Sequence, residues 1–360
     1  MTTSDPSSGS GQPSAGSGEP AAVFRHHWLR DWRVWLGVAI SVVCLWLVMR
    51  GIPIAEVAAA MERADLPLLL ALSVPAYVAN VVVRALRWRH LTNPIAPISR
   101  ATLFRGASIG FMVNNLAPLR IGELVRSWYV ARESSTSTSA ILGTVVLERV
   151  VDVVTVLAIA AVALAWLGVE SEETGLLREG AILTIPVALA PLFALLALRL
   201  APDRVIAIVH FFARPFPEGM GHTLESALRR FAEGLGALSG GSHLFWIFFY
   251  SLLIWLVFST LPLLAGTLAF GLDLGPPGRT LMTCWILLAA VGVAVALPSA
   301  PGFFGPYQLA FQAVLERFGV EPATALALGL LVWFVFWATL TLLGLIVMRS
   351  RGVRLDDLAG

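Results

Sequence analysis

Ionisable side chains inside apolar sequence are the residues of this chain best suited to chemistry. Glu148, Arg149 and Asp152 interrupt the run GTVVLERVVDVVTVLAIAAVALAWLG, and Arg120 and Glu123 lie in NNLAPLRIGELVR. A charge at the centre of a bilayer costs roughly 3 kcal/mol on insertion scales. These residues must therefore be paired, hydrated or close to an interface, and a functional site is the default hypothesis for them.

The composition around these charges is typical of a polytopic membrane protein. Of 360 residues, 57% are hydrophobic and only 13% are charged, and the mean hydropathy is +0.79. All 25 basic residues are arginine, which excludes a lysine Schiff base and a GxxxxGK[ST] nucleotide loop. Cys44 and Cys284 lie in separate apolar runs and the six histidines have no metal-ligand spacing, so we expect no metal site and no cofactor.

The apolar runs predict an all-α integral membrane fold with about eight transmembrane helices. The segment around 103–130 is also apolar, but Asn114, Asn115, Pro118 and Arg120 interrupt it. We therefore expect a re-entrant hairpin or a broken helix there, which needs protein or water to satisfy its backbone. The eight predicted spans are 34–49, 66–86, 139–168, 181–200, 243–270, 280–297, 303–318 and 323–348.

The remaining sequence predicts the organisation around these spans. Residues 1–22 are rich in Ser, Gly and Pro, and we expect a disordered tail. Residues 23–349 form the predicted transmembrane domain, and 350–360 form a short cytoplasmic tail. Within the domain, 203–238 has the helical spacing of a cytoplasmic amphipathic loop. Arginines gather before the first span and after the last, which predicts a cytoplasmic (inner) membrane protein with both termini cytoplasmic.

The spacing of the acidic residues leaves two functions open. Glu148 and Asp152 are four residues apart, so on a helix both carboxylates project from one face, with Arg149 beside them. The group is either a structural ion cluster that joins this helix to a neighbour, or a gating or ion-coupling site that includes Glu123.

The arginines predict anion binding. Arg120 and Arg126 follow the interruption, where unwound backbone and the start of a half-helix favour negative charge. The planar guanidinium suits a pair of phosphate oxygens. Arg84 and Arg87 either follow the positive-inside rule or bind a lipid phosphate. The candidate headgroup-binding residues are Arg120, Arg126, Asn114, Asn115, Arg84 and Arg87.

A second interruption lies far along the chain in ALPSAPGFFGPYQLAFQ, which starts at Ala296. Its prolines and glycines cannot form an ordinary helix interior. Both interruptions carry a proline followed four residues later by a glycine, and paired interruptions of this kind indicate a transporter site. The candidate broken-helix residues are Pro118, Gly122, Pro298, Pro301, Gly302, Gly305, Tyr307 and Gln308.

The segments RALRWRHL, NNLAPLRIGELVR, GTVVLERVVDVV and PSAPGFFGPYQ, in this order, resemble the lysylphosphatidylglycerol synthase transmembrane family, also called flippase-like. The resemblance runs from about residue 34 to 348 and implies a multi-span lipid translocation domain. Synthase activity is expected to be absent, because the chain ends twelve residues after Met348. The family commonly has a glutamate at the position of Gln308, so any ion coupling would differ here or rest on other carboxylates.

These features predict a lipid flippase or transporter that moves an anionic phospholipid or a polyprenyl-phosphate-linked lipid across the cytoplasmic membrane, and no enzymatic activity. Two alternatives stay open. One is an integral membrane transferase that modifies a lipid, with Glu123 or Asp152 as base. The other is an accessory subunit of an envelope-lipid enzyme. The expected partners are membrane lipids, an anionic lipid substrate and, in the last case, an envelope enzyme, with no nucleic acid.

Overall fold

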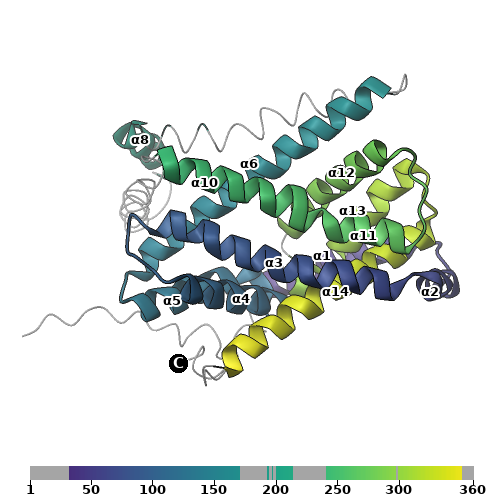
Figure 1. The fold of residues 1–360 in the computed structure, drawn as a ribbon, viewed down its shortest axis with the longest axis horizontal. Coiled ribbons are helices and arrows are strands. Elements are labelled where there is room, and N and C mark those ends of the chain that lie inside the picture. The colour runs from purple at the N-terminus through teal and green to yellow at the C-terminus, as the bar shows by residue number, and fades with distance from the viewer. Residues whose placement is uncertain are drawn as a thin grey trace, which may run out of the picture.

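The computed structural model describes residues 32–170, 193, 197, 200–213, 241–296 and 299–350. Every regular element in these ranges is helical, as the apolar runs predict (Figure 1). The elements are α1 (Trp32–Met49), α2 (Ile54–Arg63), α3 (Leu66–Thr92), α4 (Arg100–Leu116), η3 (Pro118–Arg120), α5 (Gly122–Ser134), α6 (Thr138–Glu170), α8 (Pro202–Ala213), α10 (Gly241–Leu252), η5 (Leu253–Ser259), α11 (Leu261–Ala269), α12 (Pro277–Ala296), η6 (Pro301–Phe303), α13 (Pro306–Leu315), η7 (Glu316–Phe318) and α14 (Pro322–Arg349).

Five helical segments are long and apolar enough to cross a membrane. They are α3, α6, the continuous run from α10 through η5 to α11, α12 and α14. Helices α1 and α2 provide a sixth candidate only as a bent pair, with an angle of 83° between them. The described residues therefore contain five or six candidate spans, and the predicted count of eight is not confirmed.

Two predicted spans have no counterpart among the six candidates, and 34–49 has one only as part of the bent pair. The 181–200 segment lies outside the described residues apart from three single positions. The 303–318 segment does not form one spanning helix. Its helix α13 has 10 residues, about 15 Å at 1.5 Å per residue, against a hydrocarbon core of about 30 Å. The predicted span was wrong because the helix begins only at Pro306 and already ends at Leu315, where the η7 turn follows.

The first interruption forms a helical hairpin. Helices α4 and α5 pack against each other across η3, as expected for 103–130. Gly110 and Gly122 lie where the two helices approach most closely, because a Cβ on Gly122 would overlap the Gly110 carbonyl oxygen. The Asn114 side chain accepts a hydrogen bond from the Gly122 backbone N–H at 2.9 Å. Small residues and one amide thus fix this turn, and its placement inside a membrane stays a prediction.

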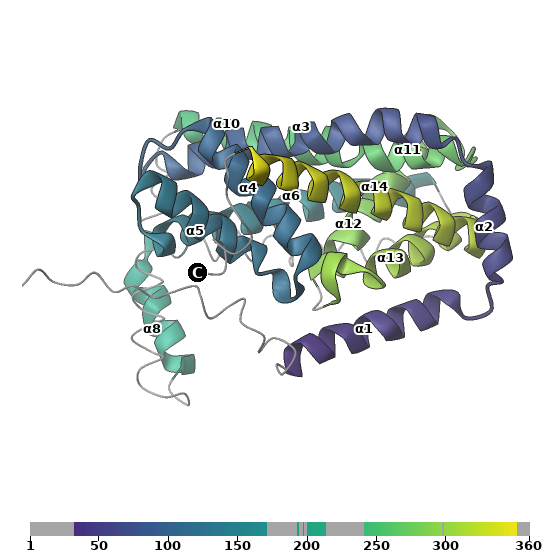
Figure 2. The same cartoon turned by 90° about the horizontal axis from the view of Figure 1, so that it is seen from below.

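The second interruption turns the chain between α12 and α13, which also pack together. Gly302 and Gly305 have φ of 69° and 101°, in the region that favours glycine. The η6 turn contacts both η3 and α4, so the two interruptions meet in space. Helix α1 runs beside α13 (Figure 2) and contacts η3. The Ser41 hydroxyl of α1 accepts a hydrogen bond from the Ala300 backbone N–H at 2.9 Å.

Several predicted features lie outside the described residues. They are the tails 1–22 and 350–360 except for Ser350, and the amphipathic part of 203–238 beyond α8. The disorder, the amphipathic helix and the cytoplasmic position of the termini stay predictions.

Candidate functional site

Two carboxylates of α6 face two arginines of α3. Asp152 pairs with Arg84 at 2.8 Å and with Arg87 at 2.7 Å. Glu148 lies 3.4 Å from Arg84 and 3.3 Å from Arg87. The spacing explains the pairing: carboxylates four residues apart and arginines three apart each occupy one helix face. The structural ion cluster that the sequence left open is therefore present.

The hairpin joins the same cluster through α5. Arg126 lies 3.3 Å from Glu148, and Arg149 lies 3.6 Å from Glu123 and 3.0 Å from Glu148. Glu148 is completely buried and is shared by four arginines. Because α3, α5 and α6 all contribute, the cluster fixes the hairpin against two candidate spans.

The run α10–η5 completes the cluster with residues that the sequence reasoning missed. The Trp255 indole N–H donates to Asp152 at 3.0 Å, and Arg87 donates to the Ser251 hydroxyl at 2.9 Å. Trp255 belongs to η5, a π-helical turn, and such turns are frequent at functional sites. The sequence around Trp255 is an apolar run with no pattern that predicts a π turn. It therefore gave no indication that Trp255 belongs to the site.

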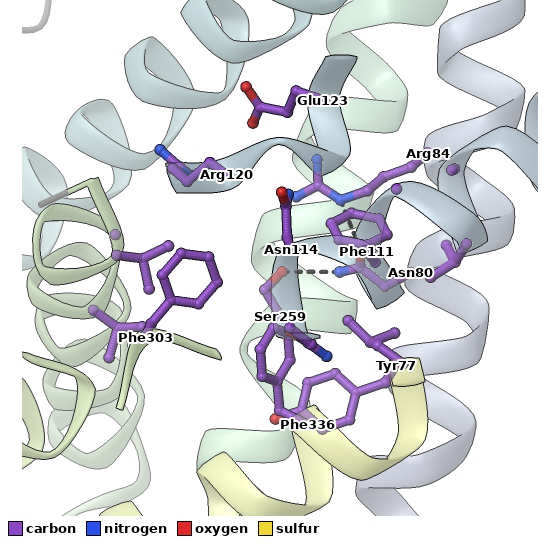
Figure 3. Close-up of a pocket in the computed structure, with 18 of the residues that line it drawn as sticks. Tyr77, Asn80, Arg84, Phe111, Asn114, Arg120, Glu123, Ser259, Phe303 and Phe336 are labelled. Atoms are coloured by element: carbon purple, nitrogen blue, oxygen red, sulfur yellow. Dashed lines mark hydrogen bonds between the residues drawn. The ribbon is translucent and has the colours of Figure 1, made fainter. Parts of the chain in front are cut away.

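A cavity of about 180 Å³ opens beside the cluster. Figure 3 shows Arg84, Arg120 and Glu123 toward one end of the cavity, and Tyr77 and Phe336 toward the other. Asn80 lies between them and donates to the Ser259 hydroxyl at 3.0 Å. The lining residues that carry charge are Arg84, Arg120, Glu123, Arg126 and Arg149. The cavity therefore has one charged end and one apolar end.

Arg120 and Phe303 bring the two interruptions together at this cavity. The Arg120 guanidinium lies 5.6 Å from the centre of the Phe303 ring. Both residues have positive φ, 56° and 63°, although neither is glycine. Backbone of this kind costs about 1–3 kcal/mol per residue and is concentrated at functional sites. The two broken segments therefore face each other at the cavity, and the transporter site that their paired proline–glycine pattern predicts stays a prediction.

The candidate headgroup residues divide into two groups. Arg84, Arg120, Arg126 and both asparagines line the cavity. Arg87 does not, because it is completely buried within the ion cluster.

The two asparagines also have structural partners. Asn115 donates to the Trp337 carbonyl oxygen and to the Thr341 hydroxyl, both at 3.1 Å, which joins α4 to α14. Asn114 holds the start of α5 through Gly122. Sequence position alone could not separate these contacts from ligand binding.

The broken-helix residues act mainly on the backbone. Pro118 begins η3 and Pro301 begins η6, Tyr307 lines the cavity, and Pro298 lies outside the described residues. Gln308 is completely buried, and its side-chain oxygen accepts from the Gly305 N–H at 2.7 Å. The contact satisfies one of the free N–H groups at the start of α13.

Replacing Gln308 with leucine is expected to lower the free energy of unfolding by about 1–2 kcal/mol, because the cap is lost. The shift in melting temperature of the purified protein measures this. Gln312→Leu on the same helix is the matched control, since the Gln312 side-chain oxygen has no hydrogen-bond partner among the described residues. Equal melting temperatures for the two variants would contradict the capping role.

The similarity of this chain to known proteins covers the elements that form the site. A family model described as the lysylphosphatidylglycerol synthase TM region matches residues 34–344. The chain belongs to this family. Its hairpin, its second break and the ion cluster all lie within the matched range.

Two curated relatives extend the comparison. Glycosyltransferase AglD of Haloferax volcanii is 26% identical over 319 residues, which cover 82% of this chain and 50% of AglD. The chain therefore spans about half the length of that relative. The UPF0104 membrane protein PH1989 of Pyrococcus horikoshii is 26% identical over 332 residues, which cover 88% of this chain and 96% of the relative. No solved structure matches.

Proposed function

We propose that this membrane protein moves an anionic lipid across the bilayer and holds the lipid phosphate on Arg120 and Arg126. The observation that carries the proposal is Arg126, which is 3% exposed, lines the cavity and leaves two guanidinium nitrogens without a hydrogen-bond partner among the described residues. A buried charged donor without a partner costs at least about 1–3 kcal/mol. A phosphate accepts from a guanidinium through two oxygens and removes that cost.

The charge balance supports an anionic ligand. Arg84, Arg87, Arg126 and Arg149 of the cluster, with Arg120 beside it, outnumber the carboxylates of Glu123, Glu148 and Asp152 by two. An uncompensated charge is unfavourable at low dielectric. A lipid phosphate carries about one to two negative charges and offsets this surplus.

The apolar end of the cavity supports a lipid rather than a free anion. The aliphatic and aromatic residues that line the cavity include Val81, Leu263, Leu288 and Phe336. Burying hydrocarbon there is favourable by about 25 cal/mol per Å² of apolar surface. The family, whose description names a phospholipid synthase, agrees with a lipid ligand.

Replacing Arg120 with methionine is expected to reduce lipid movement at least tenfold. The side chain has no ion pair within 4 Å in the described residues, so its loss should leave the fold intact. One charge-assisted hydrogen bond is worth about 1.5–3 kcal/mol, and about 1.4 kcal/mol corresponds to tenfold. The measurement is the transbilayer movement of fluorescent phosphatidylglycerol in liposomes that contain the purified protein.

Arg132→Met is the matched control, because Arg132 is exposed at the end of α5 and packs on Trp128 away from the cavity. Its rate should equal that of the unsubstituted protein. Equal rates for Arg120→Met and Arg132→Met, or no increase over protein-free liposomes, would contradict the proposal.

A non-enzymatic role fits the state of the carboxylates. Asp152 accepts from Arg84, Arg87 and Trp255, and Glu123 lies beside Arg149. These ion pairs and hydrogen bonds already occupy the oxygens that a catalytic base would use, which disfavours the transferase alternative. We propose that the protein resides in the cytoplasmic membrane with cytoplasmic termini, as its arginine distribution predicts.

The match to half of AglD supports a second candidate, an accessory role beside an envelope enzyme. In that role the chain would hold an anionic lipid for a separate catalytic protein. Two results together would favour this candidate over transport. They are stoichiometric co-purification of such an enzyme, and a rate of lipid movement in the liposome assay no higher than in protein-free liposomes.

A further inference from the structure

Helix α3 carries a line of polar residues along one face. Up to Arg87, its polar residues are Ser73, Tyr77, Asn80, Arg84 and Arg87, separated by four, three, four and three positions. This spacing places all five on one side of a helix. The other residues from Leu66 to Arg87 are apolar. The line therefore extends from the ion cluster toward the opposite end of a candidate span.

Asn80, Arg84 and Arg87, at one end of this line, belong to the site already described. Arg84 and Arg87 bind the carboxylates of α6. Asn80 accepts from the Arg84 Nε at 2.8 Å and donates to Ser259 at 3.0 Å. Both Asn80 and Ser259 line the cavity. A headgroup bound at the arginines would meet these neutral polar groups next along α3.

Three aromatic rings mark the lower end of the cavity. The Tyr77 ring packs edge-on against Phe336, with centroids 5.5 Å apart. The Tyr307 ring stacks with the Phe336 ring, with centroids 6.3 Å apart. All three residues line the cavity, and both tyrosines are buried. Figure 3 shows Tyr77 and Phe336 side by side at this end.

Ser73 lies one helical turn beyond these rings. Its side chain is 1% exposed, and its hydroxyl has no hydrogen-bond partner among the described residues. Serine hydroxyls inside helices commonly bond to the carbonyl four residues earlier, so an unpaired buried one is unfavourable for folding. Pro75, between Ser73 and Tyr77, removes a helix hydrogen bond at this point. A proline is one of the identifiable causes of helix bending.

We propose that the face of α3 from Arg84 to Ser73 is the track along which the lipid headgroup crosses the protein. The rings of Tyr77, Tyr307 and Phe336 close this track between the cavity and Ser73. Bending of α3 at Pro75 would move Tyr77 relative to Phe336 and open it. This inference rests on the proposed transport function and names the side chains that form the path and its barrier.

Cysteine accessibility tests the track. Asn80→Cys and Ser73→Cys variants of the full chain are treated in liposomes with a small, negatively charged methanethiosulfonate, and labelling is measured by mass spectrometry at each site. We expect rapid labelling in Asn80→Cys and at least tenfold slower labelling in Ser73→Cys. Adding Tyr77→Ala to Ser73→Cys should raise its labelling rate at least tenfold, whereas adding Tyr77→Phe should not.

The native Cys284 is an internal control for folding, since it is buried and 1% exposed. Labelling of Cys284 in the Tyr77→Ala variant would identify general loosening, and a Tyr77→Val replacement, which keeps a larger apolar side chain, would then serve as the opening variant. Equal labelling of Ser73→Cys with and without the opening substitution, while Cys284 stays unlabelled, would overturn the track.

The labelling does not depend on lipid movement, so the two proposals fail separately. Labelling as expected without phosphatidylglycerol movement would refute transport of that lipid and keep the track. Loss of lipid movement in Arg120→Met would support the proposed function. If, in addition, Ser73→Cys is labelled at the same rate with and without Tyr77→Ala, the track is refuted.

Discussion

Replacing Glu148 with glutamine is expected to lower the free energy of unfolding by about 3–5 kcal/mol. Glu148 is completely buried, and four arginines lie within 3.4 Å of its carboxylate oxygens. Removing one partner of a buried ion pair leaves an uncompensated charge in a medium of low dielectric, which is why the cost is large. The measurement is the melting temperature of the purified protein, followed through its 12 tryptophans.

Glu133→Gln is the matched control. Glu133 pairs with Arg105 at 3.7 Å, but its side chain is 44% exposed, and exposed pairs contribute about 0–1 kcal/mol. A second variant separates charge from packing: Arg126→Met combined with Glu148→Gln should be less destabilised than Glu148→Gln alone, because Glu148 is the one carboxylate that pairs with Arg126 among the described residues. If Glu148→Gln melts at the same temperature as Glu133→Gln, the cluster does not hold the helices together.

Replacing Gly122 with alanine is expected to cost about 3 kcal/mol or more and to disrupt the α4–α5 hairpin. The added methyl group would overlap the Gly110 carbonyl oxygen and lie 2.6 Å from the Asn114 side-chain oxygen. Overpacking usually costs about 1–3 kcal/mol, and here the nearest obstacle is backbone, which cannot rotate away. Lower melting temperature and loss of lipid movement should occur together, because Arg120 and Arg126 flank this glycine.

Gly292→Ala controls for the effect of adding a methyl group to a helical glycine. The nearest atom to a Cβ at Gly292 is a Val156 methyl group at 3.7 Å, an ordinary contact. Alanine is favoured over glycine in helices by about 1 kcal/mol, so this variant should be as stable as the parent or more stable. A Gly122→Ala protein with the same stability as Gly292→Ala would show that the two helices are not in close contact.

Much of the architecture follows from local sequence. The apolar runs predicted an all-helical membrane fold, and five of the predicted spans correspond to candidate spans of the structure. Proline and glycine predicted both interruptions, because these residues act on the backbone wherever they stand. The hydropathy of 303–318 nevertheless predicted a span there, although its helix α13 has only 10 residues and is too short to cross a membrane. Local chemistry therefore determines where helices form and where they break.

The site was predictable in its residue types and only partly in its contacts. The cost of burying charge predicted that Glu148 and Asp152 would find partners. The partners themselves, Arg84 and Arg87, lie more than 60 positions earlier on another helix, and nothing in the local pattern sets how two helices align. Packing alone decided that Arg87 is enclosed by the cluster while Arg84 lines the cavity.

The sequence by itself determined the charges, the two breaks and the polar line along α3, because spacing on a helix fixes which side chains share a face. Only the tertiary structure decided that the breaks meet through Arg120 and Phe303, that Asn115 binds α14 and that Trp255 reaches Asp152. These contacts depend on the relative depth and rotation of separate helices. Those are set by the packing of many side chains together, which no short segment contains.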